Sequence, residues 1–435
     1  MGIELRRRPK VSRLDGSHRC VSPSETREML TANSTLPSIL GETELIVPKD
    51  LELPVHFVQA RLIPGTEMLD EVMGKGFSQE QSFCSAVMEA VERFSCSLFP
   101  SEKLMEATYE QIAPDAIDPA KFGVFRSGPY ASTLPIDWVH AWNLHEKRSY
   151  LVPAMSGRYI SRHLGHWYYR DGGEKRDYTF SDANGCASGN CIEEAISHGI
   201  CEVVERDAIT IWARNRCTPP SVEIPESTSN PYLAELIRRI QGESNLSLTI
   251  RYLTLDLDIH VFACLVYDAN LDHSMVGYGA HLDPNIGLLR AATEMMQARA
   301  LLIRRWGSLK QPTGFRGIEK EKIDYLVGDT GGTIQFSDLR DRSTSDLAED
   351  IEVLMKTLEK GGLEVLVVDN TREDLAIPAV KVLIPGIQRV DWAWLFGNEL
   401  LGSGSDRVFS VPHRLGLVDP PRRLGELDIT QLTFQ

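Results

Sequence analysis

The chain has 435 residues, of which 42% are hydrophobic, and its 46 basic and 61 acidic side chains give a formal net charge of −15. This length suits one large α/β domain with arms, or two to three smaller units, and the apolar content can fill their cores. The negative charge argues against nucleic acid and anionic lipid as partners. No apolar run approaches the ~20 residues that span a bilayer.

The chain begins with a basic segment, residues 1–16, which lacks the apolar stretch of a signal peptide. We therefore expect a solvated arm and a cytoplasmic protein. Ser22 or Ser24 is a candidate N-cap for a short helix with Pro23 in its first turn. The expected organisation is an N-terminal arm and lead-in subdomain over 1–65, a catalytic domain over 66–395 and a C-terminal tail over 396–435.

Eight cysteines occur without a C-x-x-C pair, at positions 20, 84, 96, 186, 191, 201, 217 and 264. This pattern indicates buried thiols in a reducing compartment. His163 and His166, in "HLGH", have no third ligand nearby, so we expect no zinc site there. We assign Cys20 no role.

From about 66 to 215, strand-like runs alternate with two long helical segments, which predicts a mixed α/β fold. The strand-like runs are "WVHAWNL", "SYLVPAM" and "RDYTFSDA". A polar, Pro-rich stretch at 216–231 predicts a loop or a subdomain boundary. Beyond it we expect helices over about 232–241, about 284–305 and "TSDLAEDIEVLMKTLEK", strands in "SLTIRYLTL", "HVFACLVYD", "LEVLVVDN" and "AVKVLIPGI", and a Gly-rich turn at 277–279.

The first long helix follows "GKGF", with Ser78 as N-cap and Gln81 at capping-box spacing. Ser85, Glu89 and Glu92 then fall at i, i+4 and i+7, so they share one face. The surrounding positions are apolar or small, which predicts that much of this helix is buried. Isolated buried carboxylates cost roughly several kcal/mol, so these need a counter-charge or a bound cation.

The second helix lies in "SDANGCASGNCIEEAISHGICEVVERDA", and we expect Asn190 to cap it. Its polar stripe holds Glu194, His198, Glu202 and Glu205. Both helices contain E-x-x-E-R, ending at Arg93 in the first and at Arg206 in the second. If the two stripes face each other, four carboxylates meet, an arrangement that suits Mg²⁺ when phosphates complete its coordination.

The third helix, in "GYGAHLDPNIGLLRAATEMMQARALLIRR", is predicted to begin at Pro284. Arg290, Glu294 and Gln297 share one face, and Arg299 lies close by. Guanidinium groups there would neutralise phosphate or hold the glutamates.

Small polar and glycine-rich segments, "GKG" and "SGN", precede the first two helices, whose N-termini favour anions. Lys75 within "GKG" would add a point charge for a phosphate. The chain has no Walker A, dinucleotide-binding, G-x-S-x-G or H-E-x-x-H motif. We therefore expect any nucleotide to be held by Mg²⁺ between carboxylate helices.

With these motifs the chain resembles the YcaO family, whose members use ATP to activate a peptide backbone amide. The resemblance covers about 66–390 and rests on "GKGFSQEQSFCSAVMEAVERFS", "NGCASGNCIEEAISHGICEVVERDA" and "LDPNIGLLRAATEMMQAR". It implies three related strand, Gly-turn and helix units around an ATP site. The candidate Mg²⁺ ligands are Glu89, Glu92, Glu202 and Glu205, and the candidate ATP-binding residues are Lys75, Ser85, Asn190, Glu194, Arg290, Glu294, Gln297 and Arg299. No catalytic residue is assigned.

The chain departs from the family pattern at several positions. Members often have serine where this chain has Ala187 and glutamine where it has His198, which leaves nucleotide contacts from these positions open. A Q-x-x-x-R spacing is absent because Leu301 follows Gln297, and Arg299 or Arg290 is expected to substitute. The tail "LGELDITQLTFQ" lacks the proline-rich end of azoline-forming members.

"SHRCVSPSET" at 17–26 resembles the lead-in of YcaO proteins that act with a TfuA-type partner to make peptide thioamides. Together with the tail, this favours thioamidation of a ribosomally made peptide or protein over azoline formation, with macroamidine closure also open. The resemblance further implies a TfuA-like or leader-binding partner and a homodimer. Two alternatives stand beside it: a non-catalytic ATP-binding accessory protein and a carboxylate-based hydrolase without nucleotide.

Overall fold

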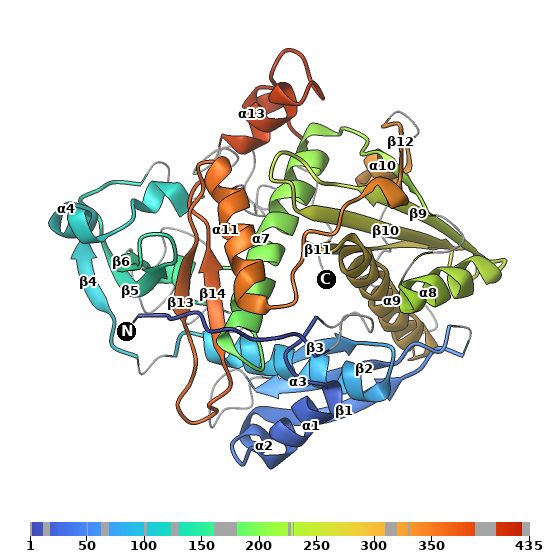
Figure 1. Ribbon diagram of the computed structural model, residues 1–435, viewed down its shortest axis with the longest axis horizontal. Helices are drawn as coiled ribbons and strands as arrows, with labels where there is room; N and C mark the ends of the chain where they lie inside the picture. The colour runs from blue at the N-terminus through green and yellow to red at the C-terminus, as the bar shows by residue number, and fades with distance from the viewer. Residues whose placement is uncertain are drawn as a thin grey trace.

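The computed structural model describes residues 2–11, 18–49, 51–61, 69–99, 102–122, 130–160, 181–224, 228, 230–308, 320–328, 331–387 and 406–428. Over these residues the protein is a mixed α/β structure with three separate sheets (Figure 1). Within this part of the chain, no helix has the length and apolarity needed to cross a bilayer.

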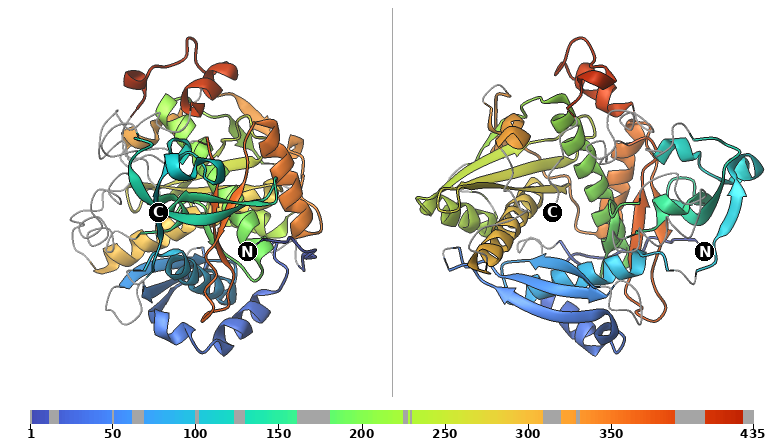
Figure 2. Two further views of the ribbon diagram at one scale, coloured as in Figure 1. Left: turned by 90° about the vertical axis from the view of Figure 1, so that its left-hand side faces the viewer. Right: turned by 180° about the vertical axis from the view of Figure 1, so that it is seen from behind.

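The first sheet is antiparallel, in the order β1-β2-β3. Its strands are β1 (Leu40–Ile46), β2 (Val55–Arg61) and β3 (Leu69–Lys75). Helix α3 (Gln79–Cys96) packs on β2 and β3, and α1 (Pro23–Ala32) packs on α3, with α2 (Leu36–Ile39) close by. Figure 2 shows this layer at one end of the molecule.

The second sheet has the order β11-β10-β9-β8-β12. Its strands are β8 (Ser221–Glu223), β9 (Leu246–Tyr252), β10 (His260–Asp268), β11 (His273–His281) and β12 (Thr333–Gln335). Helix α9 (Pro284–Ser308) lies across β10 and β11, α8 (Pro231–Gly242) packs on β9 and α9, and α10 (Lys320–Val327) is near β12 (Figure 1).

The third sheet has the order β4-β5-β13-β14-β7, with β6 also paired to β5. Its strands are β4 (Met105–Thr108), β5 (Pro135–Asn143), β6 (Arg148–Pro153), β7 (Cys186–Ser188), β13 (Leu366–Asp369) and β14 (Ala379–Leu383). The remaining helices are α4 (Tyr109–Ile112), α5 (Ala154–Gly157), α7 (Ile192–Asn215), α11 (Leu347–Lys360) and α13 (Arg407–Arg414), with 3₁₀ turns at Ala113–Asp115, Pro119–Phe122, Phe336–Asp338 and Leu424–Glu426.

Helix α7 runs through the middle of the molecule, between the second and third sheets (Figure 1). Its apolar residues, including Ile196, Ile200 and Val204, share one core cluster with Val382 of β14 and Tyr278 of β11. Carboxylates on a helix that is buried on most sides need a counter-charge or a bound cation. Those of α7 line a cavity.

The predicted three-unit architecture is confirmed. Strand β3 leads into α3, β7 into α7 and β11 into α9, and each strand belongs to a different sheet. Each sheet therefore has one strand that leads into one of these three helices, and the three helices meet at a common centre. The predicted helices after residue 216, the strands near 246–268 and 366–383, and those in "WVHAWNL" and "SYLVPAM" are also present.

The predicted Gly-rich turn at 277–279 is wrong, because these residues lie inside β11. A Cβ atom on Gly277 would sit 2.1 Å from the backbone nitrogen of Met295, and one on Gly279 would sit 2.2 Å from the carbonyl oxygen of Gly287. The glycines allow α9 to pack closely on the strand, a second common use of glycine in strands.

Of the three predicted helix caps, those of α1 and α3 are confirmed and that of α7 is wrong. Ser78 accepts a hydrogen bond from the Gln81 backbone at 3.0 Å, as predicted. Of the two predicted candidates, Ser22 is the N-cap of α1, and it also forms a full capping box with Glu25. Asn190 is not the cap of α7: the helix begins one residue later, with Cys191 at the N-cap and no side-chain cap. The side chain of Asn190 instead donates to Glu194 at 2.9 Å.

The expectation of a solvated arm holds in part for the described residues 2–11: most of them are exposed, but hydrogen bonds and an ion pair dock the segment on the protein. It runs past the N-terminal turns of α7 and α11 (Figure 1), where the Arg6 backbone donates to Glu193 at 2.7 Å and the Lys10 backbone donates to Ser345 at 2.9 Å. All eight cysteines are free, and Cys20 and Cys217 are the two that are only half-buried. His163, His166 and most of "RDYTFSDA" lie outside the described residues.

Candidate active site

A cavity of about 360 Å³ lies where α3, α7 and α9 meet. Its lining includes eleven of the twelve metal- and ATP-binding residues that the sequence predicts: Lys75, Ser85, Glu89, Glu92, Asn190, Glu194, Glu202, Glu205, Arg290, Glu294 and Gln297. Residues far apart in the sequence therefore share one site. Which ligand each of them binds remains a prediction.

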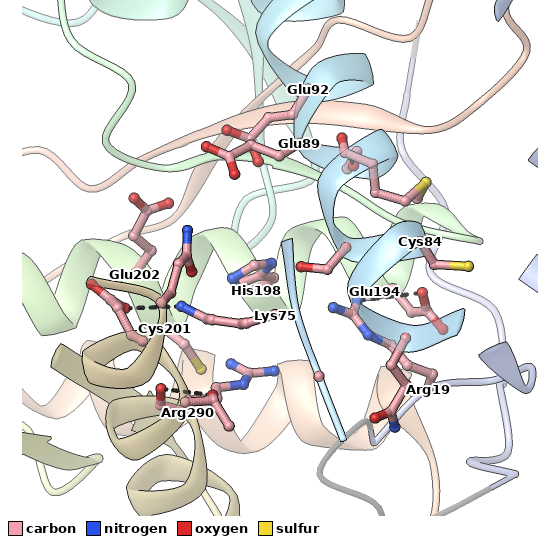
Figure 3. Close-up of a pocket in the computed structure, with 18 of the residues that line it drawn as sticks. Arg19, Lys75, Cys84, Glu89, Glu92, Glu194, His198, Cys201, Glu202 and Arg290 are labelled. Atoms are coloured by element: carbon pink, nitrogen blue, oxygen red, sulfur yellow. Dashed lines mark hydrogen bonds and ion pairs between the residues drawn. The ribbon is translucent and has the colours of Figure 1, made fainter. Parts of the chain in front are cut away.

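The four predicted metal ligands converge on this cavity from two helices. Figure 3 shows the carboxylates of Glu89 and Glu92 on α3 across the cavity from Glu202 on α7. Burial is the main cause that raises the pKa of Glu92 and Glu202, and it raises the pKa of Glu205 to about 8. These shifts mean that the carboxyl groups hold their protons more tightly in the metal-free cavity than they would in water.

Each acidic pair has its own guanidinium group. Arg93 lies 3.2 Å from Glu89 and 3.7 Å from Glu92, whereas Arg206 lies 3.9 Å from Glu202 and 3.6 Å from Glu205. The common E-x-x-E-R pattern thus gives two similar clusters. Each cluster has two carboxylates and one cation, so a divalent cation between the helices would balance their charge with the oxygen ligands that Mg²⁺ prefers.

Cations gather elsewhere along the cavity. Lys75 comes from β3, Arg290 from α9 and Arg19 from residues 18–22, the part of the arm next to α1 (Figure 3). Burial and these three cations hold the pKa of His198 well below its usual value, so the imidazole is neutral. A region with three cations and a neutral imidazole is suited to phosphate oxygens.

Two of the predicted nucleotide contacts already bind each other. Glu194 is buried and accepts the Cys20 backbone N–H at 2.7 Å and the Asn190 backbone N–H at 2.9 Å. Asn190 accepts a hydrogen bond from Thr26 of α1 at 3.0 Å. Glu194 therefore ties the arm and the loop before α7 to one wall of the cavity.

The placement predicted for Arg299 is wrong. Its side chain does not line the cavity but donates to Asp268 at the end of β10, at 2.8 Å, and both side chains are buried. Arg299 is two residues beyond Gln297, and two residues rotate a helix by about 200°, which turns the side chain away from the cavity.

Several lining residues had no predicted role. Arg19 was missed because its place in the cavity depends on a contact with Glu194 of α7 that is remote in sequence. Arg93 and Arg206 were available as a signal, since each ends a repeated pentapeptide. Cys84 and Cys201 also line the cavity, but burial raises the pKa of Cys84 to about 11 and of Cys201 to about 12, so both remain thiols.

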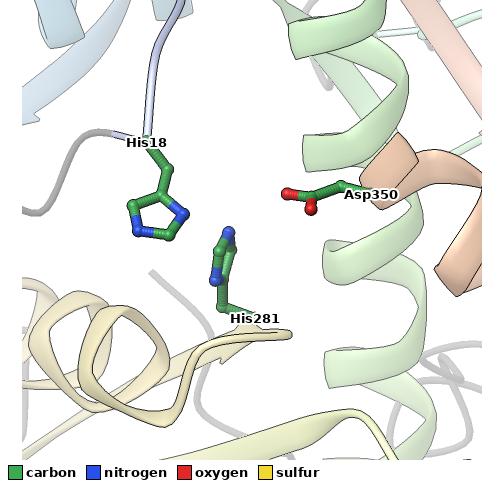
Figure 4. Close-up of side chains that lie close together, drawn as sticks. All are labelled: His18, His281 and Asp350. Carbon is green, nitrogen blue, oxygen red and sulfur yellow. The ribbon is translucent and has the colours of Figure 1, made fainter. Parts of the chain in front are cut away.

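A separate cluster lies behind the arm, where His18, His281 and Asp350 meet with their ligand atoms within 4.8 Å of one another (Figure 4). The Lys10 ammonium contacts the Asp350 carboxylate and lies 3.1 Å from His18 Nδ1 and 3.0 Å from the Thr344 carbonyl oxygen. Three acceptors satisfy this ammonium, which serves as the cation of the cluster. It fixes the arm to the first turn of α11.

A second cavity, of about 670 Å³, lies between the end of α11 and α13. Asp256, one of its lining residues, forms an ion pair with Arg407 at 2.8 Å and also contacts Arg414. None of the predicted site residues lines this second cavity.

The chain is similar to known proteins in both sequence and structure. Residues 73–388 match the YcaO family model, described as a YcaO cyclodehydratase that binds ATP and Mg²⁺. An uncharacterized protein of Methanothermobacter thermautotrophicus is 32% identical over 378 residues, which cover 85% of this chain and 94% of that protein. An uncharacterized protein in the tfuA 3′ region of Rhizobium leguminosarum bv. trifolii is 26% identical over 395 residues, covering 86% and 89%.

Among solved structures, a heterocyclase in complex with substrate and cofactor superimposes with a TM-score of 0.83 at 27% identity. The match covers 100% of this chain but only 59% of the heterocyclase chain, so this chain spans little more than half of that enzyme.

Proposed function

The chain belongs to the YcaO family, and we propose on that basis that it uses ATP and Mg²⁺ to activate a backbone amide of a peptide or protein for attack by a nucleophile. The observation that carries this proposal is one cavity lined by carboxylate pairs from two facing helices, each pair with its own arginine, and by three further cations. The family description supports ATP and Mg²⁺ as its ligands.

The residues present fit a magnesium nucleotide. Glu89 and Glu92 on α3, with Glu202 and Glu205 on α7, would hold Mg²⁺ through oxygen ligands. Bound there, Mg²⁺ would neutralise charge on the phosphates during transfer.

The remaining lining residues divide between phosphates and the rest of the nucleotide. Lys75, Arg290 and Arg19 would face the phosphate oxygens. Ser85, Asn190 and Gln297 would supply neutral hydrogen-bonding groups, while Glu194 and Glu294 orient the arm and Lys75.

This division suits the chemistry of amide activation. An amide carbonyl is a poor electrophile, and its oxygen is a poor leaving group. When a nucleophile adds to the carbonyl carbon, the oxyanion takes the γ-phosphoryl group of ATP, and the C–O bond then breaks as phosphate leaves. Fixed cations stabilise the charge on the oxygen and phosphoryl group, and the protein otherwise positions the partners.

Sulfide is the nucleophile we propose, which gives a thioamide. The relative encoded beside tfuA supports this choice and suggests a TfuA-like partner protein for this chain as well. Azoline formation is the second candidate, because a heterocyclase shares the fold over all of this chain. We further propose that residues 66–395 form the catalytic domain, which the family match over 73–388 supports. From the resemblance alone we also propose that the protein acts as a homodimer.

Phosphate release and peptide mass together test the proposal. The purified protein, Mg²⁺, ATP and a candidate precursor peptide should release phosphate with sulfide present, and one peptide oxygen should be replaced by sulfur. Loss of water instead would assign azoline formation. Glu89→Gln and Glu202→Gln should abolish both signals, and turnover that persists in both variants would overturn the proposal.

A further inference from the structure

Two thiols meet at the junction of the arm and α7. The sulfur atoms of Cys20 and Cys191 lie 3.6 Å apart, although 171 residues separate them in the sequence. A disulfide has sulfur atoms about 2.05 Å apart, so an approach of about 1.5 Å would close the bond. Cys20 is half-buried, whereas Cys191 is buried at the N-cap of α7.

The two segments that carry these thiols already bind each other. Glu194 accepts the Cys20 backbone N–H at 2.7 Å and lies 3.4 Å from an Arg19 guanidinium nitrogen. The Thr26 hydroxyl donates to Asn190 at 3.0 Å, next to Cys191. Little chain freedom remains to be lost on closure, which favours a bond between these two sulfurs.

The exposure of Cys20 distinguishes the Cys20–Cys191 pair from a second pair of cysteines. Cys96 and Cys186 also interact with each other, but both are almost completely buried, at 0% and 1% exposure. Oxidation begins at an accessible thiol. Of these four cysteines, Cys20 is therefore the one that an oxidant in solution reaches first.

A thiophilic metal is a less suitable occupant, even though Glu194 lies close to both thiols. The Glu194 carboxylate already accepts hydrogen bonds on both oxygens, from Cys20 on one and from Asn190 on the other. A metal would have to displace these contacts, whereas a disulfide leaves them in place.

We propose that Cys20 and Cys191 form a reversible disulfide that fastens the arm to the start of α7 at the wall of the cavity. A peroxide oxidises the Cys20 thiol to a sulfenic acid and is reduced to water. The Cys191 sulfur then attacks the Cys20 sulfur, hydroxide leaves, and the Cys191 proton converts it to water. A dithiol reductant reverses the bond by exchange.

The bond has a consequence for the cavity. Arg19 and Val21 flank Cys20, Asn190 precedes Cys191, and all three line the cavity. A fastened arm cannot move away from the site, so a bound nucleotide leaves more slowly. This consequence rests on the proposed ATP site, whereas formation of the bond does not.

Peptide mapping tests the bond itself. The full chain is treated with hydrogen peroxide, digested without reductant and analysed by mass spectrometry. We expect one crosslinked pair of peptides, with two hydrogens lost, that dithiothreitol separates. It should be absent from Cys20→Ser and Cys191→Ser but retained in Cys217→Ser, which removes the other half-buried thiol. A Cys96–Cys186 crosslink, over-oxidised Cys20 without a crosslink, or stoichiometric zinc that Cys20→Ser abolishes would each overturn the proposal.

Release of a fluorescent ATP analogue with Mg²⁺, followed by stopped flow, tests the consequence. Oxidation should slow release at least about threefold in the wild-type chain and leave Cys191→Ser unchanged. A crosslink without slower release would contradict the fastening of the site. If the reduced wild-type chain bound no analogue, the proposed function would fail, while the peptide map would still decide the disulfide.

Discussion

Lys75 on β3 and Glu294 on α9 form an ion pair of 3.2 Å across the cavity, although 219 residues separate them in the sequence. The pair joins two of the three strand-helix units. It also shows that polar groups of the cavity neutralise one another in the protein alone. A phosphate that enters must therefore compete with Glu294 for Lys75.

Replacing Lys75 tests its predicted contact with phosphate. Lys75→Met should lower the affinity for Mg²⁺–AMPPNP about tenfold, or about 1.4 kcal/mol, because a phosphate loses its point charge. Isothermal titration calorimetry measures the change. Lys356→Met, at an exposed position on α11, is the matched control and should bind like the wild type. An unchanged affinity in Lys75→Met would remove Lys75 from the site.

Glutamine at the acidic positions tests the proposed metal ligands. Glu89→Gln and Glu202→Gln should each weaken Mn²⁺ binding about tenfold or more in the presence of AMPPNP, because each removes a charged oxygen ligand. Electron paramagnetic resonance counts free Mn²⁺ directly. Glu80→Gln, on the same helix as Glu89 but outside the cavity, serves as the control. Equal binding in all three variants would contradict the ligand assignment.

The raised pKa of Glu205 predicts a dependence on pH. Burial is the largest cause that raises this pKa, to about 8, while Arg206 opposes the shift. Between its ordinary pKa of 4.5 and about 8, Glu205 holds more protons in the folded metal-free protein than in the unfolded chain. The free energy of unfolding therefore falls as pH rises through that window. Metal needs the deprotonated carboxylate, so Mn²⁺ affinity should rise over the same window.

Thermal unfolding of the metal-free protein from pH 5 to 9 checks the predicted fall in stability, and Mn²⁺ titrations over the same range check the predicted rise in affinity. Glu205→Gln should flatten the fall in melting temperature of the metal-free protein. If the variant and the wild type show the same pH dependence, Glu205 does not carry the effect.

The buried pair of Lys10 and Asp350 predicts how firmly the arm is held. Lys10→Met would leave the Asp350 carboxylate buried without its partner, since the two side chains are 0% and 1% exposed. Such a loss costs about 3–5 kcal/mol. Urea unfolding should show it, whereas Arg7→Met, which breaks an exposed pair with Glu349, should cost at most about 1 kcal/mol. Adding Asp350→Asn to Lys10→Met should restore part of the loss.

Close packing between α9 and β11 predicts a steric effect. Gly277→Ala would place a Cβ atom 2.1 Å from the Met295 nitrogen, so the helix must shift or the protein unfold. We expect a loss of about 1–3 kcal/mol or more in unfolding free energy. Gly242→Ala, whose Cβ would meet nothing within 4 Å, is the control and should be close to neutral. Similar stability of the two variants would contradict the packing described for Gly277.

The helices and their acidic stripes could be predicted because their evidence is local. The spacing of Glu89 and Glu92 fixes their common face, and Ser78 caps the helix through a residue three positions away. The repeated E-x-x-E-R also indicated that two helices contribute equivalent charged residues to one site, and both helices line one cavity.

Features set by distant contacts could not be predicted in the same way. The arm docks through Glu193, Glu194 and Asp350, which no local pattern connects to it. The role of Asn190 changed for the same reason, since Glu194 holds it. Glycines at 277 and 279 are equally compatible with a turn and with a closely packed strand, and only the position of α9 decides between them.

A crystal structure with Mn²⁺ and AMPPNP, phased to show the anomalous signal of the metal, tests the central claim most directly. We expect Mn²⁺ between α3 and α7, with carboxylate oxygens from both helices as ligands and the phosphates near Lys75 and Arg290. A nucleotide bound in another cavity, or Mn²⁺ without a ligand from either helix, would contradict the account.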